Sequence, residues 1–192
     1  MEMTIDNTVG RNRIHPKKFA LLLSCASIVM MFAGLTSAYM VRHAAGNWLE
    51  FQLPILFGAN TGVILLSSVA LHAAYRGFIQ GQEKPYKWLL LAAFGLGMVF
   101  LVMQYLGWLK LQEIGVELNT NPSGSFVYAI SGIHAAHVLG GVAALFVAVM
   151  HAFTLPFKKT AARKLRFELT LIYWHFVDLL WVYLYVFFVT QH

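Results

Sequence analysis

The 192-residue chain contains a single cysteine and few charged residues, and both shortages restrict what it can be. One cysteine, Cys25, can form neither an intramolecular disulfide nor a cysteine-rich metal site. Charged residues make up 11% of the chain and hydrophobic residues 59%, a balance that water-soluble domains rarely have. Several charge-free runs exceed the roughly 20 residues that a helix needs to cross hydrocarbon. The composition therefore predicts a polytopic membrane protein.

Helices are the only membrane-spanning structure that the sequence supports. A closed barrel needs segments that alternate apolar and polar residues, and no such alternation occurs. Reading between the charged residues predicts an all-α bundle of five transmembrane helices in one domain, residues 19–192, after a cytoplasmic tail, residues 1–18. The expected spans are residues 19–41, 54–75, 88–107, 126–151 and 169–189, with an outer connecting loop over residues 108–125.

Basic residues are unevenly distributed among the segments outside these spans. Of the 14 lysines and arginines, 12 lie before the first span, after the second or after the fourth, and only Arg42 and Lys110 lie in the alternate loops. The positive-inside rule then places the N-terminus in the cytoplasm and the C-terminus outside, in the periplasm of a bacterium. Topology thus accounts for the net charge of +6, and a nucleic-acid partner is not expected.

Polar and small residues recur at helical spacing within three of the spans. Such residues are the usual contacts between membrane helices, where apolar contact alone gives little preference over lipid. We therefore expect most of them to serve helix packing. They are Asn60, Thr61, Ser67, Ser68 and His72 in the second span; Ser131, His134, His137, Gly141, Ala144, Ala148 and His151 in the fourth; and Glu168, His175, Asp178, Trp181 and Tyr185 in the fifth.

His134 and His137 lie three residues apart on one helix face. A neutral imidazole pair can ligate haem, copper or zinc, but two histidines at this spacing point the same way and cannot take opposite sides of a haem iron. A metal would need His72, His175 or Asp178 to complete its ligand shell. The spacing favours histidines that hydrogen-bond between helices over a metal site.

Asp178 interrupts an apolar run that reaches Thr190. A carboxylate in the middle of a bilayer is energetically costly, so such a residue normally faces protein or water. It could be a proton-relay group, an ion-coupling site, or an acceptor satisfied by Tyr, Trp or His of a neighbouring helix. Trp174 and His175, one turn earlier, lie close enough to influence it. The sequence leaves these alternatives open.

Several stretches of the chain resemble subunit III of the haem-copper respiratory oxidases, in the short five-helix form found in bacteria. The most specific is YWHFVD, residues 173–178, with Glu168 before it and Trp181 after it. The matching stretches occur in all five spans and in the same order as in the family. The others are residues 124–126 followed by residues 131–138 with His134 and His137, Asn60 and Thr61 with Ser67 and Ser68, Gln104 with Trp108, and residues 30–34.

The resemblance implies a non-catalytic subunit of a proton-pumping terminal oxidase, cytochrome c oxidase, in the bacterial inner membrane. Haem and copper are then expected in partner subunits and no cofactor in this chain. The implied partners are subunit I by direct contact, subunit II, a small subunit IV and bound phospholipid. The implied roles are stability, lipid binding and proton uptake of subunit I. Residues expected to support them are Glu168, Trp174, His175, Asp178, Trp181, His134, His137, Asn60 and Gln104.

The chain departs from the resembled family in two respects. Longer relatives have seven helices, and the two N-terminal ones that form one wall of a lipid cleft are missing here, which leaves another subunit to supply that wall. Many relatives also have a buried glutamate where this chain has Ile28. Isoleucine cannot titrate, so any role of that carboxylate is not transferred.

Other functions remain open from the sequence. Quinol oxidase subunits and an accessory subunit of nitric oxide reductases share the five-span form. An independent proton-coupled transporter would use Asp178 and the histidines as a relay, although transporters usually show paired repeats with broken helices, and this chain shows neither. A haem-bearing membrane enzyme would require the histidines to be ligands.

Overall fold

The computed structural model describes residues 15–118 and 121–191, and the structure consists of five long helices. No strand occurs within those two ranges. Each helix is long and apolar enough to cross a membrane, which confirms the predicted all-α fold. The helices are α1 (Pro16–Ala44), α2 (Ile55–Gln80), α3 (Glu83–Glu113), α4 (Pro122–Thr154) and α5 (Ala161–Thr190).

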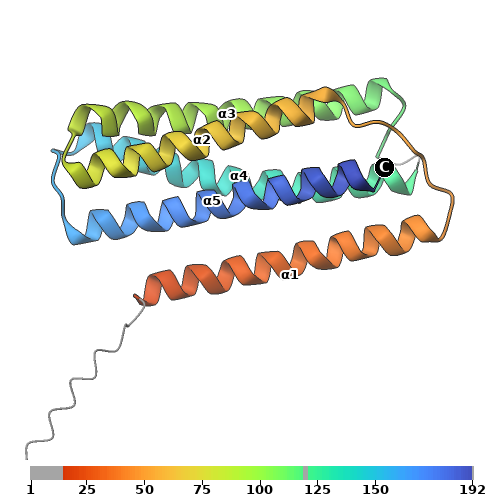
Figure 1. Ribbon diagram of the computed structural model, residues 1–192, viewed down its shortest axis with the longest axis horizontal. Coiled ribbons are helices and arrows are strands. Elements are labelled where there is room, and N and C mark those ends of the chain that lie inside the picture. Colours follow the sequence, from red (N-terminus) through yellow and green to blue (C-terminus); the bar gives the residue numbers. More distant parts are fainter. Residues whose placement is uncertain (1–14, 119–120, 192) are drawn as a thin grey trace, which may run out of the picture.

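Helices α2 to α5 form a closed four-helix bundle, and α1 lies along one side of it (Figure 1). Within the bundle α2 packs on α3 and α5, and α4 packs on the same two helices. Helix α1 contacts only α4 and α5 among the described elements, through a row of buried residues that includes Phe32, Thr36 and Tyr39. Most of the surface of α1 is therefore left for lipid or for another protein.

Each helix is longer than its predicted apolar span because its ends continue into charged and turn-forming residues. The loop predicted over residues 108–125 was wrong for this reason: α3 continues to Glu113 and α4 begins at Pro122. Gly115 has a φ of 81° and follows the end of α3, and the Val116 N–H bonds to the Leu111 carbonyl. This is the Schellman arrangement, in which a left-handed glycine closes a helix.

The centre of the bundle is built around Trp174, which is fully buried. Two glycines face its ring from different helices. A Cβ atom added to Gly97 of α3 would lie 2.8 Å from Cη2 of the ring, and one added to Gly141 of α4 would lie 2.9 Å from Cε3. Both glycines are needed because any side chain would overlap the indole, and they allow α3, α4 and α5 to pack closely.

The predicted basic loops come together at one end of the molecule. Lys159, in the connection between α4 and α5, donates a hydrogen bond from Nζ to the carbonyl of Ile79, 3.0 Å away, near the end of α2. The turn between α2 and α3 and the connection between α4 and α5 therefore share an end, as the charge distribution requires. Which compartment this end faces remains a prediction from the positive-inside rule.

Cysteine labelling in a Cys25→Ala background tests the orientation. We expect cysteines placed at Lys84 and Lys158 to react with a membrane-impermeant maleimide only when the cytoplasmic side is accessible. Cysteines at Glu50, between α1 and α2, and at Gln112, in the last turn of α3, should react in intact spheroplasts. Labelling of Lys158→Cys in intact spheroplasts would reverse the proposed orientation.

Candidate functional site

Polar side chains of α2 and α5 meet along the line where these helices pack, which we call the α2–α5 seam. Three residues predicted on one side of the fifth span bind α2: Glu168, His175 and Trp181. The seam consists of Thr61, Ser68, His72 and Tyr75 of α2 and Glu168, His175, Asp178 and Trp181 of α5.

Three hydrogen bonds cross the seam. The Trp181 Nε1–H donates to Thr61 Oγ1 at 3.0 Å. The Ser68 hydroxyl bonds to Nδ1 of His175. Nearer the basic end, the Tyr75 hydroxyl donates to Oε1 of Glu168 at 2.7 Å. These bonds lie at successive levels along the bundle, so they fix the axial register of α2 against α5.

Asp178 lies in the middle of the seam and is 2% exposed. Neither of its carboxyl oxygens has a hydrogen-bond donor in the described part of the chain. Ser68 faces the carboxyl group, and its hydroxyl bonds to Nδ1 of His175. The expectation of an acceptor satisfied by Tyr, Trp or His is therefore not met: the nearby Trp174 Nε1–H is itself without a partner.

His134 and His137 diverge despite their spacing of three residues. His134 is fully buried and stacks on Trp181, with ring centroids 5.0 Å apart. Nδ1 of His137 instead donates to the Ile133 carbonyl of its own helix at 2.8 Å. The expected interhelical hydrogen bonds of this pair are wrong, because aromatic packing holds His134 and the local backbone occupies His137.

Asn60 and Gln104 form a buried amide pair between α2 and α3. Nδ2 of Asn60 donates to Oε1 of Gln104 at 3.1 Å, and both side chains are about 1% exposed. Ser67 reinforces the same interface, since its hydroxyl donates to the Ala93 carbonyl at 2.8 Å. The polar residues of α2 thus serve two neighbours: Asn60 and Ser67 bind α3, while Thr61 and Ser68 bind α5.

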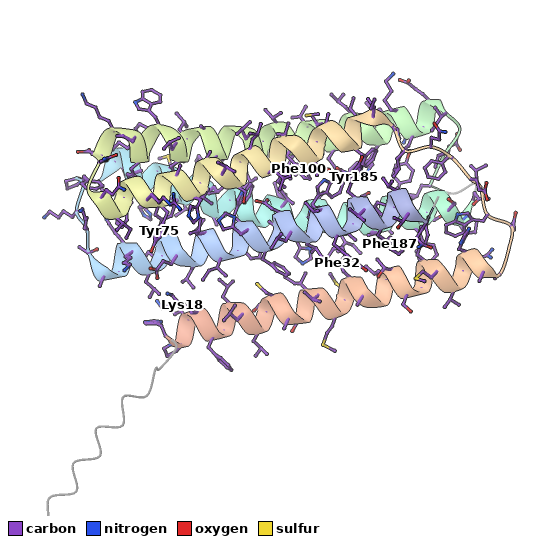
Figure 2. The ribbon with its side chains drawn as sticks, in the orientation of Figure 1. Lys18, Phe32, Tyr75, Phe100, Tyr185 and Phe187 are labelled. Atoms are coloured by element: carbon purple, nitrogen blue, oxygen red, sulfur yellow. The ribbon has the colours of Figure 1, made fainter. Side chains whose placement is uncertain are left out.

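Glu168 joins three helices at the basic end of the bundle. It is ion-paired with Lys18 of α1, with Nζ and Oε2 2.6 Å apart, and lies 3.8 Å from Nζ of Lys164. The Tyr75 hydroxyl bonds to its other oxygen. Figure 2 shows Lys18 at the first turns of α1, on the side that faces α5. Glu168 is therefore the tie that holds the start of α1 against the bundle.

Replacing Glu168 with glutamine should loosen the start of α1. The ion pair is partly exposed, with 18% of the Glu168 side chain and 32% of the Lys18 side chain accessible, so we expect a loss of about 1 kcal/mol. Hydrogen exchange of residues 16–25 should become several-fold faster, while residues around Phe32 stay protected. The matched control is Glu83→Gln, which removes an ion pair with Lys87 inside α3. If residues 16–25 exchange equally fast in Glu168→Gln and Glu83→Gln, the ion pair of Glu168 does not hold the start of α1.

The described residues contain no group of three or more His, Cys, Asp or Glu placed to hold a metal ion. His72 and His175 approach each other with ring centroids 5.8 Å apart, but His134 stacks on the ring of Trp181. The metal ligands considered from the sequence, His134 and His137 with His72, His175 or Asp178, are therefore not brought together.

A cavity of about 480 Å³ opens at the basic end, between α4 and α5. Its walls are mostly apolar and include Ala148 and Phe167. His151, Arg163 and Arg166 also contribute to its lining. An apolar groove with cationic groups suits an amphiphile that carries an anionic head group.

The sequence did not indicate several residues on which these contacts depend. Charge and hydropathy mark Lys18 only as a flanking charge and Tyr75 only as a span boundary, yet both bind Glu168. Gly97 had no pattern that marked it as the contact for Trp174. Glycines inside a membrane helix often mark close packing, but nothing in the sequence distinguishes Gly97 from Gly95.

The fold and these contacts define a multi-pass α-helical membrane protein whose intramembrane polar residues mainly join helices and leave one buried carboxyl group without a partner. A family model described as cytochrome c oxidase subunit III matches residues 12–191. The chain belongs to that family.

Individual relatives agree with the family match. The chain is 30% identical over 190 residues to cytochrome c oxidase subunit 3 of Corynebacterium diphtheriae, covering 91% of this chain and 88% of the relative. It is 28% identical to the subunit 3 of Dasypus novemcinctus, covering 88% of this chain and 67% of the relative. It is 33% identical over 136 residues to that of Trichophyton rubrum, covering 71% and 48%.

Proposed function

We propose that the chain is the non-catalytic subunit III of a proton-pumping terminal oxidase, a cytochrome c oxidase, in a bacterial cytoplasmic membrane. The observation that carries the proposal is the family match, which spans residues 12–191 and so includes all five helices. Subunit I is the proposed direct partner, with subunit II and a small subunit IV in the same complex. Haem and copper belong to these partners in this proposal.

The proposed roles are to stabilise the complex, bind phospholipid and assist proton uptake by subunit I. The sparse packing of α1 supports a partner or lipid on its outer side, where Phe19, Met30 and Val41 are each more than half exposed. The cavity between α4 and α5 supports lipid binding, because its walls are apolar and arginines contribute to its lining. The seam, with its titratable side chains and the buried Asp178, supports a link to proton uptake.

Purification from the native membrane tests this function. We expect an affinity tag at the C-terminus to retrieve a complex with a haem absorption spectrum and a large multi-span subunit I. A copper-A-containing subunit II in the same complex would select cytochrome c as electron donor. A complex without copper A that oxidises quinol, or one that reduces nitric oxide, would assign the chain to those oxidoreductases. Retrieval of the chain alone, active in proton-coupled transport, would refute the accessory-subunit function.

A further inference from the structure

We propose that Asp178 is a proton-binding site in the membrane interior, which exchanges protons with the basic end of the bundle through Ser68, His175 and His72. The proposal concerns side chains of this chain alone. It goes beyond membership of an oxidase, and it holds whichever electron donor the complex uses.

The first argument is the isolation of the carboxyl group. Asp178 is 2% exposed and its oxygens have no donor among the described residues. The basic groups nearest along α5 surround Glu168, ten residues earlier, which is about 15 Å at 1.5 Å per residue. An ionised carboxylate without a cation or hydrogen bonds is very costly in such a place. The group therefore requires a proton, and the proton requires a route.

The second argument is the order of the neighbouring side chains. The Ser68 hydroxyl faces Asp178 and bonds to Nδ1 of His175. The ring of His175 is half-buried and lies 5.8 Å, centroid to centroid, from the ring of His72. His72 is exposed. Carboxyl group, hydroxyl and two imidazoles thus follow one another from the interior to the outer face of α2, one turn from Tyr75 and the Glu168 cluster at the basic end.

Each member of this chain of groups can pass a proton on. A hydroxyl both donates and accepts, and a neutral imidazole donates from one ring nitrogen and accepts at the other. When Asp178 takes the proton of Ser68, Ser68 takes one from His175 and His175 takes one from the side of His72. Ser68 ends unchanged, His175 ends with its proton on Nε2 instead of Nδ1, and the net result is one proton moved from the side of His72 to the carboxylate. One bridging water suffices for the step between the two imidazoles.

Other titratable groups around the seam do not provide a competing exit. On α4, His134 is fully buried behind Trp181, and the ring of His137 is engaged by its own helix. On α1, Lys18 is ion-paired with Glu168. Toward the basic end, Tyr75 follows His72 by one turn and bonds to Glu168, so the seam continues to charged groups beyond His72. On α3, the stretch of residues 88–109 contains one titratable residue, Tyr105, and it is exposed.

Infrared difference spectroscopy of the purified complex in lipid tests the proposal. The C=O stretching band of the Asp178 carboxyl group is assigned by its loss in Asp178→Asn. Transfer from H₂O to D₂O shifts this band when the proton is replaced, and the rate of the shift measures exchange. We expect Ser68→Ala to slow exchange roughly a hundredfold, the low end of what one positioned proton-transfer group contributes. Ser68→Thr, which keeps a hydroxyl, should restore most of the rate.

The matched control is Ser67→Ala. Ser67 is the adjacent residue, but its hydroxyl bonds to the Ala93 carbonyl of α3 and takes no part in the route. Its variant should exchange at the wild-type rate. His72→Phe provides a second test, because an exposed residue can be changed with little effect on the fold, and it should also slow exchange.

Three results would overturn the proposal. The first is exchange of the Asp178 band in Ser68→Ala and His72→Phe at the wild-type rate. The second is no exchange in the wild type, and the third is a carboxylate band in its place throughout the accessible pH range. Each can be observed in a complex that assembles normally. If the chain purifies without an oxidase, the same measurement on the full chain in lipid still decides the question, so the two proposals fail independently.

Discussion

Gly141→Ala should destabilise the chain, whereas the same substitution at the neighbouring Gly140 should leave its stability unchanged or raise it. A Cβ atom at Gly141 would lie 2.9 and 3.0 Å from two atoms of the Trp174 ring, and one at Gly140 would meet only the Tyr173 hydroxyl at 3.7 Å. The indole cannot move away, because Gly97 contacts it from α3. Such overpacking costs about 1–3 kcal/mol.

The two substitutions share the same gain in helix propensity, about 1 kcal/mol for alanine over glycine. Their difference therefore isolates the contact with Trp174. Thermal unfolding followed by tryptophan fluorescence should give a midpoint below the wild type for Gly141→Ala. The midpoint of Gly140→Ala should equal that of the wild type or exceed it. The pair Gly97→Ala and Gly95→Ala repeats the comparison on α3, since a Cβ atom at Gly95 meets no atom within 4 Å. Equal midpoints within both pairs would mean that the glycines do not set the helix spacing.

The number, order and class of the helices could be predicted because charge-free length is a direct consequence of bilayer thickness. Helix ends could not. The sequence places Trp108 outside the third span, yet α3 continues past it, and its Nε1–H donates to Ser131 of α4 at 3.0 Å. Hydropathy marks where apolar residues stop, whereas a helix stops where a backbone feature such as the left-handed Gly115 closes it.

The polar faces could be predicted, but their partners could not. Spacing of three and four residues put Asn60, Ser67 and Ser68 on one side of the second span. The structure divides that side, with Asn60 and Ser67 facing α3 and Ser68 facing α5. Periodicity describes one helix at a time, so which neighbour lies opposite each residue depends on the order in which the helices pack. The same limit explains why the tie between Lys18 and Glu168 was not foreseen.

The unpartnered state of Asp178 leads to the second large expected effect. Asp178→Leu should raise the stability of the chain, because a buried polar group without a hydrogen bond costs about 1–3 kcal/mol. Leucine is of similar size and suits the apolar neighbours of α5, and it removes this cost. Exchanging buried ionic groups for well-packed hydrophobic ones is often neutral or stabilising in the same way. Asp178→Asn keeps a polar group there and should stay close to the wild type.

The contrasting variant is Asn60→Leu. Asn60 donates to Gln104 in an equally buried position, so its loss leaves the Gln104 oxygen unpaired and should cost about 1–3 kcal/mol. Thermal unfolding of the three variants in one lipid or detergent should therefore rank Asp178→Leu above the wild type and Asn60→Leu below it. A midpoint for Asp178→Leu as low as that for Asn60→Leu would show that Asp178 is held by hydrogen bonds from water or a partner subunit.

Together, a stabilising Asp178→Leu and the infrared experiment decide whether the Asp178 carboxyl group serves packing or proton exchange. A carboxyl group kept for packing would be lost without consequence, since a leucine packs better. A carboxyl group that lowers stability and also exchanges protons through Ser68 and His175 is instead kept for the exchange, in line with the general conflict between stability and function at working sites. The seam would then have two parts: Thr61, Trp181, Tyr75 and Glu168 hold α2 against α5, and this hold keeps Ser68 between the imidazole of His175 and the carboxyl group it serves.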